Sequence, residues 1–559
     1  MATDSKLVFP SAILERWRRW DNGARQRVNA HWLEIARADP TFSRVCMTVE
    51  LVFGDGTVVR LARQPVRTTS SIDGSVHHYQ QGLAEEPDLD HQLDITSTAA
   101  SARSLTFALP VDVVDPGAVL LRGGMLAGVG EVALQRDGDD YELRHVLLRG
   151  DMVGGVAWGA SGELVQVSIS DPTETQSLLV PATSIDTERW PSAQEDVVGL
   201  RYPLVINGYP HVPCQRVVDD HGVTGLVWLA CAPGRDVEVT ATYVNGDVAA
   251  GGYLPATETD TWDGKGAAVK TIVSTASPGP WEDSDTMYVA LGRKSTTTAL
   301  SVVQVVQRLL EGYTALGRLG LNPDLFSRAQ VAMPGYPPQV LVNASGDAAV
   351  RVVDFVQGTL LASFPMVFMS YAGRGLGPVV VDRRQAPARG NVAGVLAGSQ
   401  WPLLERLVMV AETPKENLYN SFELRYGYSA MDNSYGKVVK RDASNSAACR
   451  LSEAMCGGTR AKESLDSPFI HSDELANYVI DWLVAHFALP AYYVEWSCVA
   501  ATLVRYQLGQ NVLYTDDRIA ALADAPATVV RLTYSRSRPV IGLLVWHPRW
   551  KQLLLGASA

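Results

Sequence analysis

The chain has 559 residues, several times the length of an average domain, so several packed domains are expected. Apolar residues make up 47% and charged residues 19%, which excludes a disordered chain and leaves less charge than a soluble monomer usually carries. The net charge of −12 provides no basic field for phosphate groups. A sequence-reading nucleic-acid-binding protein is therefore disfavoured, and no stretch is long and apolar enough for a membrane-spanning helix.

Cysteine usage and the first residues of the chain indicate the cellular compartment of the protein. Residues 1–7 carry no readable secretory signal, which predicts synthesis in the cytoplasm. The cysteines are too scattered for a disulfide scaffold, and no pair has the two-residue spacing of zinc or redox motifs. A reducing compartment fits these six residues best: Cys46, Cys214, Cys231, Cys449, Cys456 and Cys498.

The first predicted element is an amphipathic helix between Pro10 and Pro40, because apolar residues recur there every three or four positions. Gly23 could divide it into two shorter helices. The apolar stripe is too rich in tryptophan to remain in water. It packs either on its own chain or on a partner, and the candidate partner-interface residues are Ile13, Trp17, Trp20, Val28 and Ile35.

Short alternating runs then predict a β-rich region. Residues 48–53 and 57–61 flank Gly54-Asp55-Gly56 as a hairpin, and further strands are expected at 104–109, 131–134, 141–148 and 164–169. A barrel or sandwich is indicated. After a linker at 185–196, strands at 224–231, 237–244 and 287–291 predict a second β domain with turns at Asn245-Gly246 and Asp263-Gly264.

The period changes to helical at Leu300, where a helix reaches Tyr313, and a second helix is predicted from an Asp347 cap to Ala362. Later elements are a hairpin formed by 365–371 and 378–382, a strand over 418–428, and a helix from the Ser472 cap to Leu489. Strands at 492–500 and 510–514 and a final hairpin of 528–534 with 540–546 follow.

The predicted class is α+β, predominantly β: a multidomain chain with β-barrel or sandwich tube-like domains and a few helices. The expected division is an N-terminal amphipathic helix over 1–44, a β-rich domain over 45–196, a second β domain over 197–298, an α/β segment over 299–385, a β segment over 386–470, and a C-terminal helix with β-hairpins over 471–559.

Motifs for nucleotide binding or nucleophilic catalysis are not convincing. Gly373, Gly375 and Gly377 are followed by a strand, whereas a dinucleotide-binding loop opens a helix, so a hairpin turn is favoured. Ser161 lacks the spacing of a nucleophile elbow and is interpreted as a turn residue. Carboxylate pairs for glycoside hydrolysis cannot be identified by spacing among 60 acidic residues.

Metal-ligating residue types are densest over residues 77–91, but no spacing places two of them on one face of a regular element. An exposed loop is favoured for this set: His77, His78, Glu85, Glu86, Asp88, Asp90 and His91. Cys449 and Cys456 are interpreted as two free thiols in a loop, with a disulfide as the alternative in an oxidising exterior. We assign no catalytic, cofactor-binding or metal site and expect no enzyme activity.

Three passages carry a resemblance to a known family. They are Trp190-Pro191 with Gly199-Leu-Arg-Tyr-Pro-Leu-Val-Ile-Asn-Gly208, then Asn417-Leu-Tyr-Asn-Ser-Phe-Glu-Leu-Arg-Tyr-Gly-Tyr428, and Leu508-Gly-Gln-Asn-Val-Leu-Tyr-Thr-Asp516. With the order of predicted domains, they make the chain resemble the tail hub (baseplate hub or tail tip) proteins of siphophage-like tailed bacteriophages. The resemblance covers roughly residues 190–550.

The resemblance implies a structural virion protein, usually a homotrimer, that forms a ring at the distal end of the tail tube. Such a ring connects tube or distal tail rings to the tip and lines the channel for DNA ejection, without specific DNA binding. Expected partners are distal tail, tape-measure or tip proteins, with assembly in the host cytoplasm. The alternatives are a tail-associated polysaccharide- or peptidoglycan-degrading enzyme and a carbohydrate-binding module, the latter suggested by 13 Trp and 20 Tyr.

Overall fold

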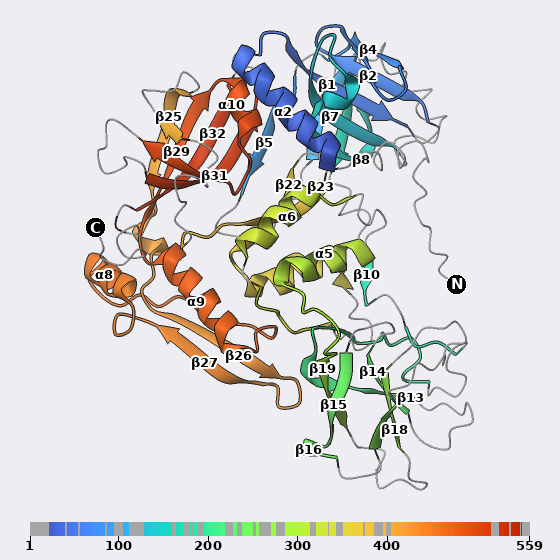
Figure 1. Cartoon of the computed structure of the whole chain (residues 1–559), viewed down its shortest axis with the longest axis vertical. Helices are drawn as coiled ribbons and strands as arrows, with labels where there is room; N and C mark the ends of the chain where they lie inside the picture. The colour runs from blue at the N-terminus through green and yellow to red at the C-terminus, as the bar shows by residue number, and fades with distance from the viewer. Residues whose placement is uncertain are drawn as a thin grey trace.

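The computed structural model in Figure 1 is an elongated body with two sheets at one end and a smaller β domain at the other. It describes residues 22–39, 42–53, 56–83, 86–93, 104–110, 128–158, 164–170, 178–181, 184–187, 195–217, 227–231, 237–249, 253–256, 270–274, 286–313, 320–333, 335–342, 350–372, 375–384, 395–397, 404–515, 525–535, 538–547 and 549. The predicted class, α+β and predominantly β, is confirmed. The described strands form open sheets, and none closes into a barrel.

The N-terminal sheet has eight strands in the order β3-β4-β2-β1-β7-β8-β9-β6. Their bounds are β1 Val45–Val52, β2 Val58–Ala62, β3 Val66–Thr69, β4 Val76–Gln81, β6 Ser104–Pro110, β7 Val129–Arg136, β8 His145–Trp158 and β9 Leu164–Ser170. The predicted first hairpin is confirmed, with Val52 opposite Val58. The strand expected to begin at residue 141 was wrong at its start: Asp140 caps a 3-10 turn over Tyr141–Leu143, and the strand begins at His145.

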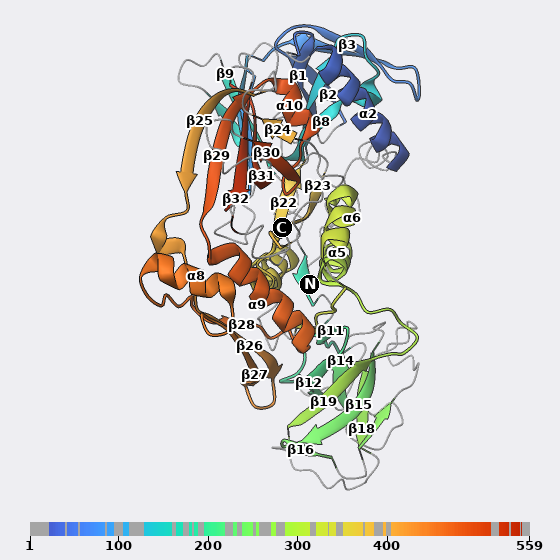
Figure 2. The ribbon, with the colours of Figure 1, turned by 60° about the vertical axis from the view of Figure 1, so that its left-hand side comes forward.

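The second β domain is a sandwich of two four-stranded sheets (Figure 2). One is β12 Tyr209–Pro213, β19 Met287–Arg293, β15 Val237–Val244 and β16 Asp247–Val248; the other is β13 Gln215–Val217, β14 Val227–Cys231, β18 Lys270–Ser274 and β17 Tyr253–Ala256. Val212 and Val289 from the first sheet share a core with Trp228 from the second. The predicted turn at Asn245-Gly246 is confirmed, with φ of 52° and 95°, as a tight hairpin requires.

The middle of the chain combines helices with short strands. They are α5 Val302–Tyr313, α6 Pro323–Ala332, α7 Val352–Asp354, β10 Leu179–Val180 with β21 Val350–Arg351, β11 Leu204–Ile206 with β20 Val340–Val342, and the hairpin β22 Val367–Ala372 with β23 Gly375–Val380. The helix predicted from Asp347 was misplaced, because the helical run begins at Val352 and passes through a π-helical turn, Phe355–Leu360, to Ser363; Asp347 lies outside the described residues. Helix α6 was missed, although Asn322-Pro323 is a strong start signal and Asn322 caps it.

The C-terminal sheet has seven strands. Six follow the order β24 Val395–Ala397, β30 Asn511–Thr515, β31 Ala525–Tyr534, β32 Val540–Trp546, β29 Ala491–Cys498 and β25 Leu404–Glu412, and the seventh, β5 Leu89–Gln92, pairs with β31. A three-stranded sheet of β27 Ser434–Arg441, β26 Phe422–Ser429 and β28 Leu465–Asp466 packs with α9 Asp473–Phe487 and lies near α8 Ala447–Cys456. The predicted alternation in β26 and the Ser472 cap of α9 are confirmed.

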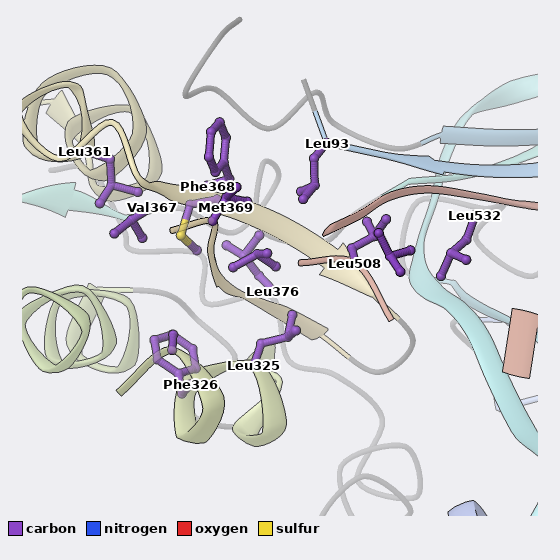
Figure 3. Close-up of a cluster of buried hydrophobic side chains, with 14 of the residues drawn as sticks. Leu93, Leu325, Phe326, Leu361, Val367, Phe368, Met369, Leu376, Leu508 and Leu532 are labelled. Atoms are coloured by element: carbon purple, nitrogen blue, oxygen red, sulfur yellow. The ribbon is translucent and has the colours of Figure 1, made fainter. Parts of the chain in front are cut away.

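One apolar core joins the two large sheets and the middle of the chain. Figure 3 shows Leu325 and Phe326 of α6 beside Leu376 of the β22–β23 hairpin, with Leu93 and Leu508 near the other end of the same cluster. Helix α2, Asn22–Ala38, lies between the sheets in Figure 1 and contacts α10, Ala500–Arg505. Within the described residues, no helix has the length and apolar character that crossing a membrane requires.

Trp32 holds α2 in this position. Its indole Nε1 donates a 2.7 Å hydrogen bond to the Leu143 carbonyl, its ring packs edge-on against Phe42, and only 2% of the residue is exposed. Replacing it with alanine leaves a cavity and an unpaired carbonyl oxygen. Trp32→Ala should therefore lower the free energy of unfolding by about 3–5 kcal/mol, measured by urea denaturation followed by circular dichroism.

Leu33 is the matched control on the same helix, because 37% of it is exposed. Leu33→Ala should change the free energy of unfolding by no more than about 0.5 kcal/mol. Equal losses from the two substitutions would contradict the special contribution of the buried Trp32 contact, because alanine itself favours the helix.

Candidate functional site

The strand β25 presents an open edge. It is the terminal strand of the C-terminal sheet and pairs with β29 on one side; no other described strand pairs with it. Met409 and Val410 are each 43% exposed, although they are neighbours whose side chains point to opposite faces. The run from Leu407 to Ala411 contains no charged residue or proline. Edge strands usually carry such residues to prevent pairing with another chain, so this edge is suited to adding a strand.

The pairing within the sheet leaves a regular stretch available. Two bulges interrupt the register with β29 between Leu404 and Met409. From Met409 to Glu412 the register is regular, with Val410 opposite Val494. The outward-facing N–H and C=O groups of this stretch, together with the exposed Met409 and Val410 side chains, offer main-chain hydrogen bonds and apolar contact at one place.

The strand β27 is also at the end of a sheet but has a different character. Its Lys437 contacts Asp473 at 2.7 Å, Lys440 contacts Glu423 at 2.6 Å, and Arg441 contacts Asp481 at 2.7 Å. Charged side chains of this kind disfavour pairing with an approaching strand. Of these two terminal strands, β25 is the better candidate for an assembly contact.

The five residues predicted at a partner interface fall into two groups. Val28 and Ile35 are buried in the apolar core of their own chain. Ile13, Trp17 and Trp20 lie outside the described residues. The structure brings Val28 and Ile35 together with Trp32, which was not among the five, and the interface role of the five stays a prediction.

A polar contact fastens the outer side of α2 to the N-terminal sheet. His31 Nε2 lies 2.9 Å from Asp139 Oδ2, and Arg136 donates two hydrogen bonds to Asp139 Oδ1 at 2.7 and 3.0 Å. Burial by itself would raise the pKa of Asp139, but the hydrogen bonds from His31 and Arg136 outweigh it and lower the pKa. Asp139 therefore connects His31 of α2 to Arg136 at the end of β7.

The residues predicted as a possible metal cluster are divided between two sheets. His77 on β4 stacks on Tyr141 with ring centroids 3.9 Å apart, whereas His91 on β5 is buried against Tyr534. Asp90 accepts hydrogen bonds from Arg531 and Thr533. Glu85 lies outside the described residues, and no group of three potential ligands forms among those the structure describes. The prediction of one exposed loop was wrong, because this segment contributes a strand to each sheet.

A network of buried charges in the N-terminal sheet was missed at the sequence level. Glu50 on β1 accepts hydrogen bonds from Arg60 Nε at 2.7 Å and from the Tyr141 hydroxyl at 3.1 Å. Glu131 on β7 binds Arg144 Nε at 2.5 Å and also Arg149. The only available signal was one glutamate in each of two otherwise apolar runs.

This network is built to hold charge rather than to transfer protons. Burial by itself would lower the pKa of Arg144, but Glu131 and the neighbouring acidic groups raise it well above its ordinary value. The guanidinium of Arg144 is therefore fixed in its charged form beside Glu131.

The remaining sequence candidates are structural where they are described. Cys449 is buried and Cys456 half-buried, and both are free; they lie on α8 rather than in the predicted loop. Seven positions along a helix separate them by about 10 Å, beyond disulfide reach. Gly377 lies in the predicted hairpin, where an added Cβ would be 2.6 Å from Leu325 Cβ. Ser161 and Gly373 lie outside the described residues.

Comparison with known proteins finds no matching family model and no matching curated protein. Among solved structures, the chain is similar to a tail protein from Neisseria meningitidis MC58, with 11% identity over 90% of this chain and 97% of that one and a TM-score of 0.36. It is also similar to the 43 kDa tail protein of prophage MuSo2 from Shewanella oneidensis, with 8% identity over 90% and 99% of the two chains and a TM-score of 0.38. At such TM-scores the likeness establishes neither a common fold nor a common function.

The Asp139 contact makes the attachment of α2 dependent on pH. Because the pKa of Asp139 is lower in the folded chain, its contribution to stability is complete above the ordinary carboxylate pKa of about 3.9 and is lost as the pH falls through the lowered value. Asp139→Asn should therefore lower the melting temperature at neutral pH, and the difference from the unaltered protein should shrink on acidification.

Asp137→Asn is the control, since this nearby carboxylate instead accepts a hydrogen bond from the Arg67 backbone N–H. Hydrogen exchange of the α2 amides should become faster in Asp139→Asn and stay unchanged in the control. A melting-temperature difference that grows as the pH is lowered would contradict this account.

Proposed function

We propose that this chain is a structural tail hub protein of a tailed bacteriophage, which forms a ring at the distal end of the tail tube. The ring connects tube or distal tail rings to the tail tip and lines the channel for DNA ejection. The observation that supports a ring is the open apolar edge of β25. The family assignment rests on the sequence resemblance described above.

The proposed ring is a homotrimer in which β25 of one subunit contacts a different surface of the next. A contact between two different surfaces generates a closed ring when the rotation between subunits completes a circle. Main-chain pairing at Met409–Glu412 would fix the direction and register of the neighbouring subunit's strand. The exposed Met409 and Val410 would add apolar contact area. The fixed register would set a constant angle between subunits.

The charge of the chain suits a DNA channel. A net charge of −12 opposes attachment of the phosphate backbone, so passing DNA would not be held. The buried guanidinium groups of Arg144 and Arg149 are already occupied by Glu131, which removes them from phosphate binding. We place the protein in the virion tail, beside distal tail, tape-measure or tip proteins, as a structural component without enzyme activity.

The edge contact is tested by a charge placed on it. Combining Met409→Lys with Val410→Lys should weaken self-association at least tenfold, because two ammonium groups would have to lose water at the subunit contact. Mass photometry should then show a shift from trimer to monomer. Negative-stain images should lose a ring with a central hole, while the melting temperature stays unchanged.

Val331→Lys is the matched control, because Val331 on α6 is 88% exposed and lies away from β25. It should leave the ring intact. An unaltered protein that remains monomeric at high concentration and also within assembled tails would contradict the proposal.

The interface role of residues 1–21 is a separate proposal. Val28, Trp32 and Ile35 already pack on their own chain, so a partner would have to bind Ile13, Trp17 and Trp20. Removing residues 1–21 should leave the melting temperature unchanged and prevent incorporation into tails. Trp17→Ala with Trp20→Ala should reproduce the loss of incorporation, whereas a collapse of the isolated fold in either variant would identify these residues as internal core.

A further inference from the structure

A small open pocket lies at the joint between the sandwich and the middle of the chain. Its cavity volume is only about 20 Å³, and it opens to solvent, so a bound group would be partly exposed. Arg293 at the end of β19 comes from the sandwich, and Arg308 comes from α5. Between these elements, Thr297, Thr298 and Leu300 form part of the wall. The pocket therefore combines groups from two parts of the chain. Any movement of one part relative to the other would change the shape of the pocket.

One wall of the pocket is fixed by Asn207. Its side chain donates to the Leu300 carbonyl at 2.7 Å and to the Pro338 carbonyl at 2.8 Å, and accepts from the Leu300 N–H at 2.8 Å. The residue has φ of 63°, a left-handed conformation that asparagine tolerates better than most residues. These bonds hold the loop before α5 against β11, so the pocket is a built feature rather than a chance gap.

The two arginines of the pocket differ from the arginines of this chain that are held in ion pairs. Arg60, Arg149 and Arg531 each form an ion pair with a carboxylate. The guanidinium groups of Arg293 and Arg308 form no hydrogen bond or ion pair within the part of the chain that the structure describes. Two guanidinium groups lining one cavity repel each other, and an anion between them would turn that repulsion into attraction.

The donors in the pocket specify the kind of anion. A guanidinium presents parallel N–H groups that match the oxygen spacing of carboxylates and phosphates. The Thr298 hydroxyl has no partner among the described residues and can donate, whereas Thr297 already donates to the Lys294 carbonyl at 2.9 Å. The set is rich in donors, and none of the described residues that line the pocket is an aspartate or glutamate.

We propose that this pocket binds one oxyanion group, a carboxylate or a phosphate, held between Arg293 and Arg308. The bound group links the sandwich to α5 and fixes the angle between them. This site does not depend on the proposed role in a phage tail. The carboxylate would come from an acidic side chain of another protein, and the phosphate would come from solution.

Two probes distinguish these sources by isothermal titration with the full-length chain. Inorganic phosphate represents the free anion, and N-acetyl-aspartate amide represents an acidic side chain. We expect at least one probe to bind saturably with one site per chain and to bind more weakly as sodium chloride is added. Preference for phosphate would assign the pocket to a free anion, and preference for the aspartate derivative would assign it to a protein carboxylate.

Variants locate the binding. Arg293→Gln and Arg308→Gln should each weaken the binding at least tenfold, whereas Lys294→Gln, which removes one charge outside the pocket, should change it by less than about twofold. Arg308→Lys keeps the charge but loses the fork of N–H groups, so it should bind with intermediate affinity and serves if Arg308→Gln misfolds. Absence of saturable binding by both probes, or binding unaffected by both arginine substitutions, would overturn the proposal.

Discussion

The pairing of β5 with β31 is the constraint on which the arrangement of the two large sheets depends. It places Leu89–Gln92 against Arg531–Tyr534, so segments about 440 residues apart form one ladder. Arg531 reinforces the ladder with two 2.9 Å bonds to Asp90. Closing so long a loop costs conformational entropy, which increases only slowly with loop length and is offset by the apolar core that the two sheets share.

Helix α2 is the second connection between the same two sheets. Its Trp32 reaches the turn before β8, and the helix also contacts α10 from the C-terminal part of the chain. Both β5 and α2 lie between the two sheets in Figure 1, and each connects them through different contacts. Two connections resist a hinge motion that one would permit.

Local sequence pattern was sufficient for many elements because their signals are local. The alternation in β26, the Ser472 cap and the Asn245-Gly246 turn each depend on residues within a few positions. The β5–β31 ladder could not be predicted in this way. Asp90 and His91 looked like metal ligands, yet one pairs with Arg531 and the other packs on Tyr534, partners that only the tertiary fold supplies.

The apolar stripe of the first helix likewise shows what the local sequence can predict and what it cannot. The helical periodicity correctly predicted that Val28 and Ile35 are buried, but it carried no information about the surface that buries them. The structure provides a surface of the same chain. For the candidate site, the sequence identified the α2 stripe but neither the β25 edge nor the arginine pocket, since both arise from the ends of sheets and the joints between domains.

Charged side chains are distributed differently inside the sheets and along their edges. Glu50 is buried against Arg60, and the half-buried Glu131 is held by Arg144 and Arg149, so removing these arginines would leave carboxylates without a cationic partner inside the sheet. These pairs therefore favour one register of β1, β2, β7 and β8 over slipped alternatives, in which each charge would lose its partner. Charged side chains also line β27, so of these two terminal strands the uncharged run of β25 is the one where another chain can pair at the lower desolvation cost.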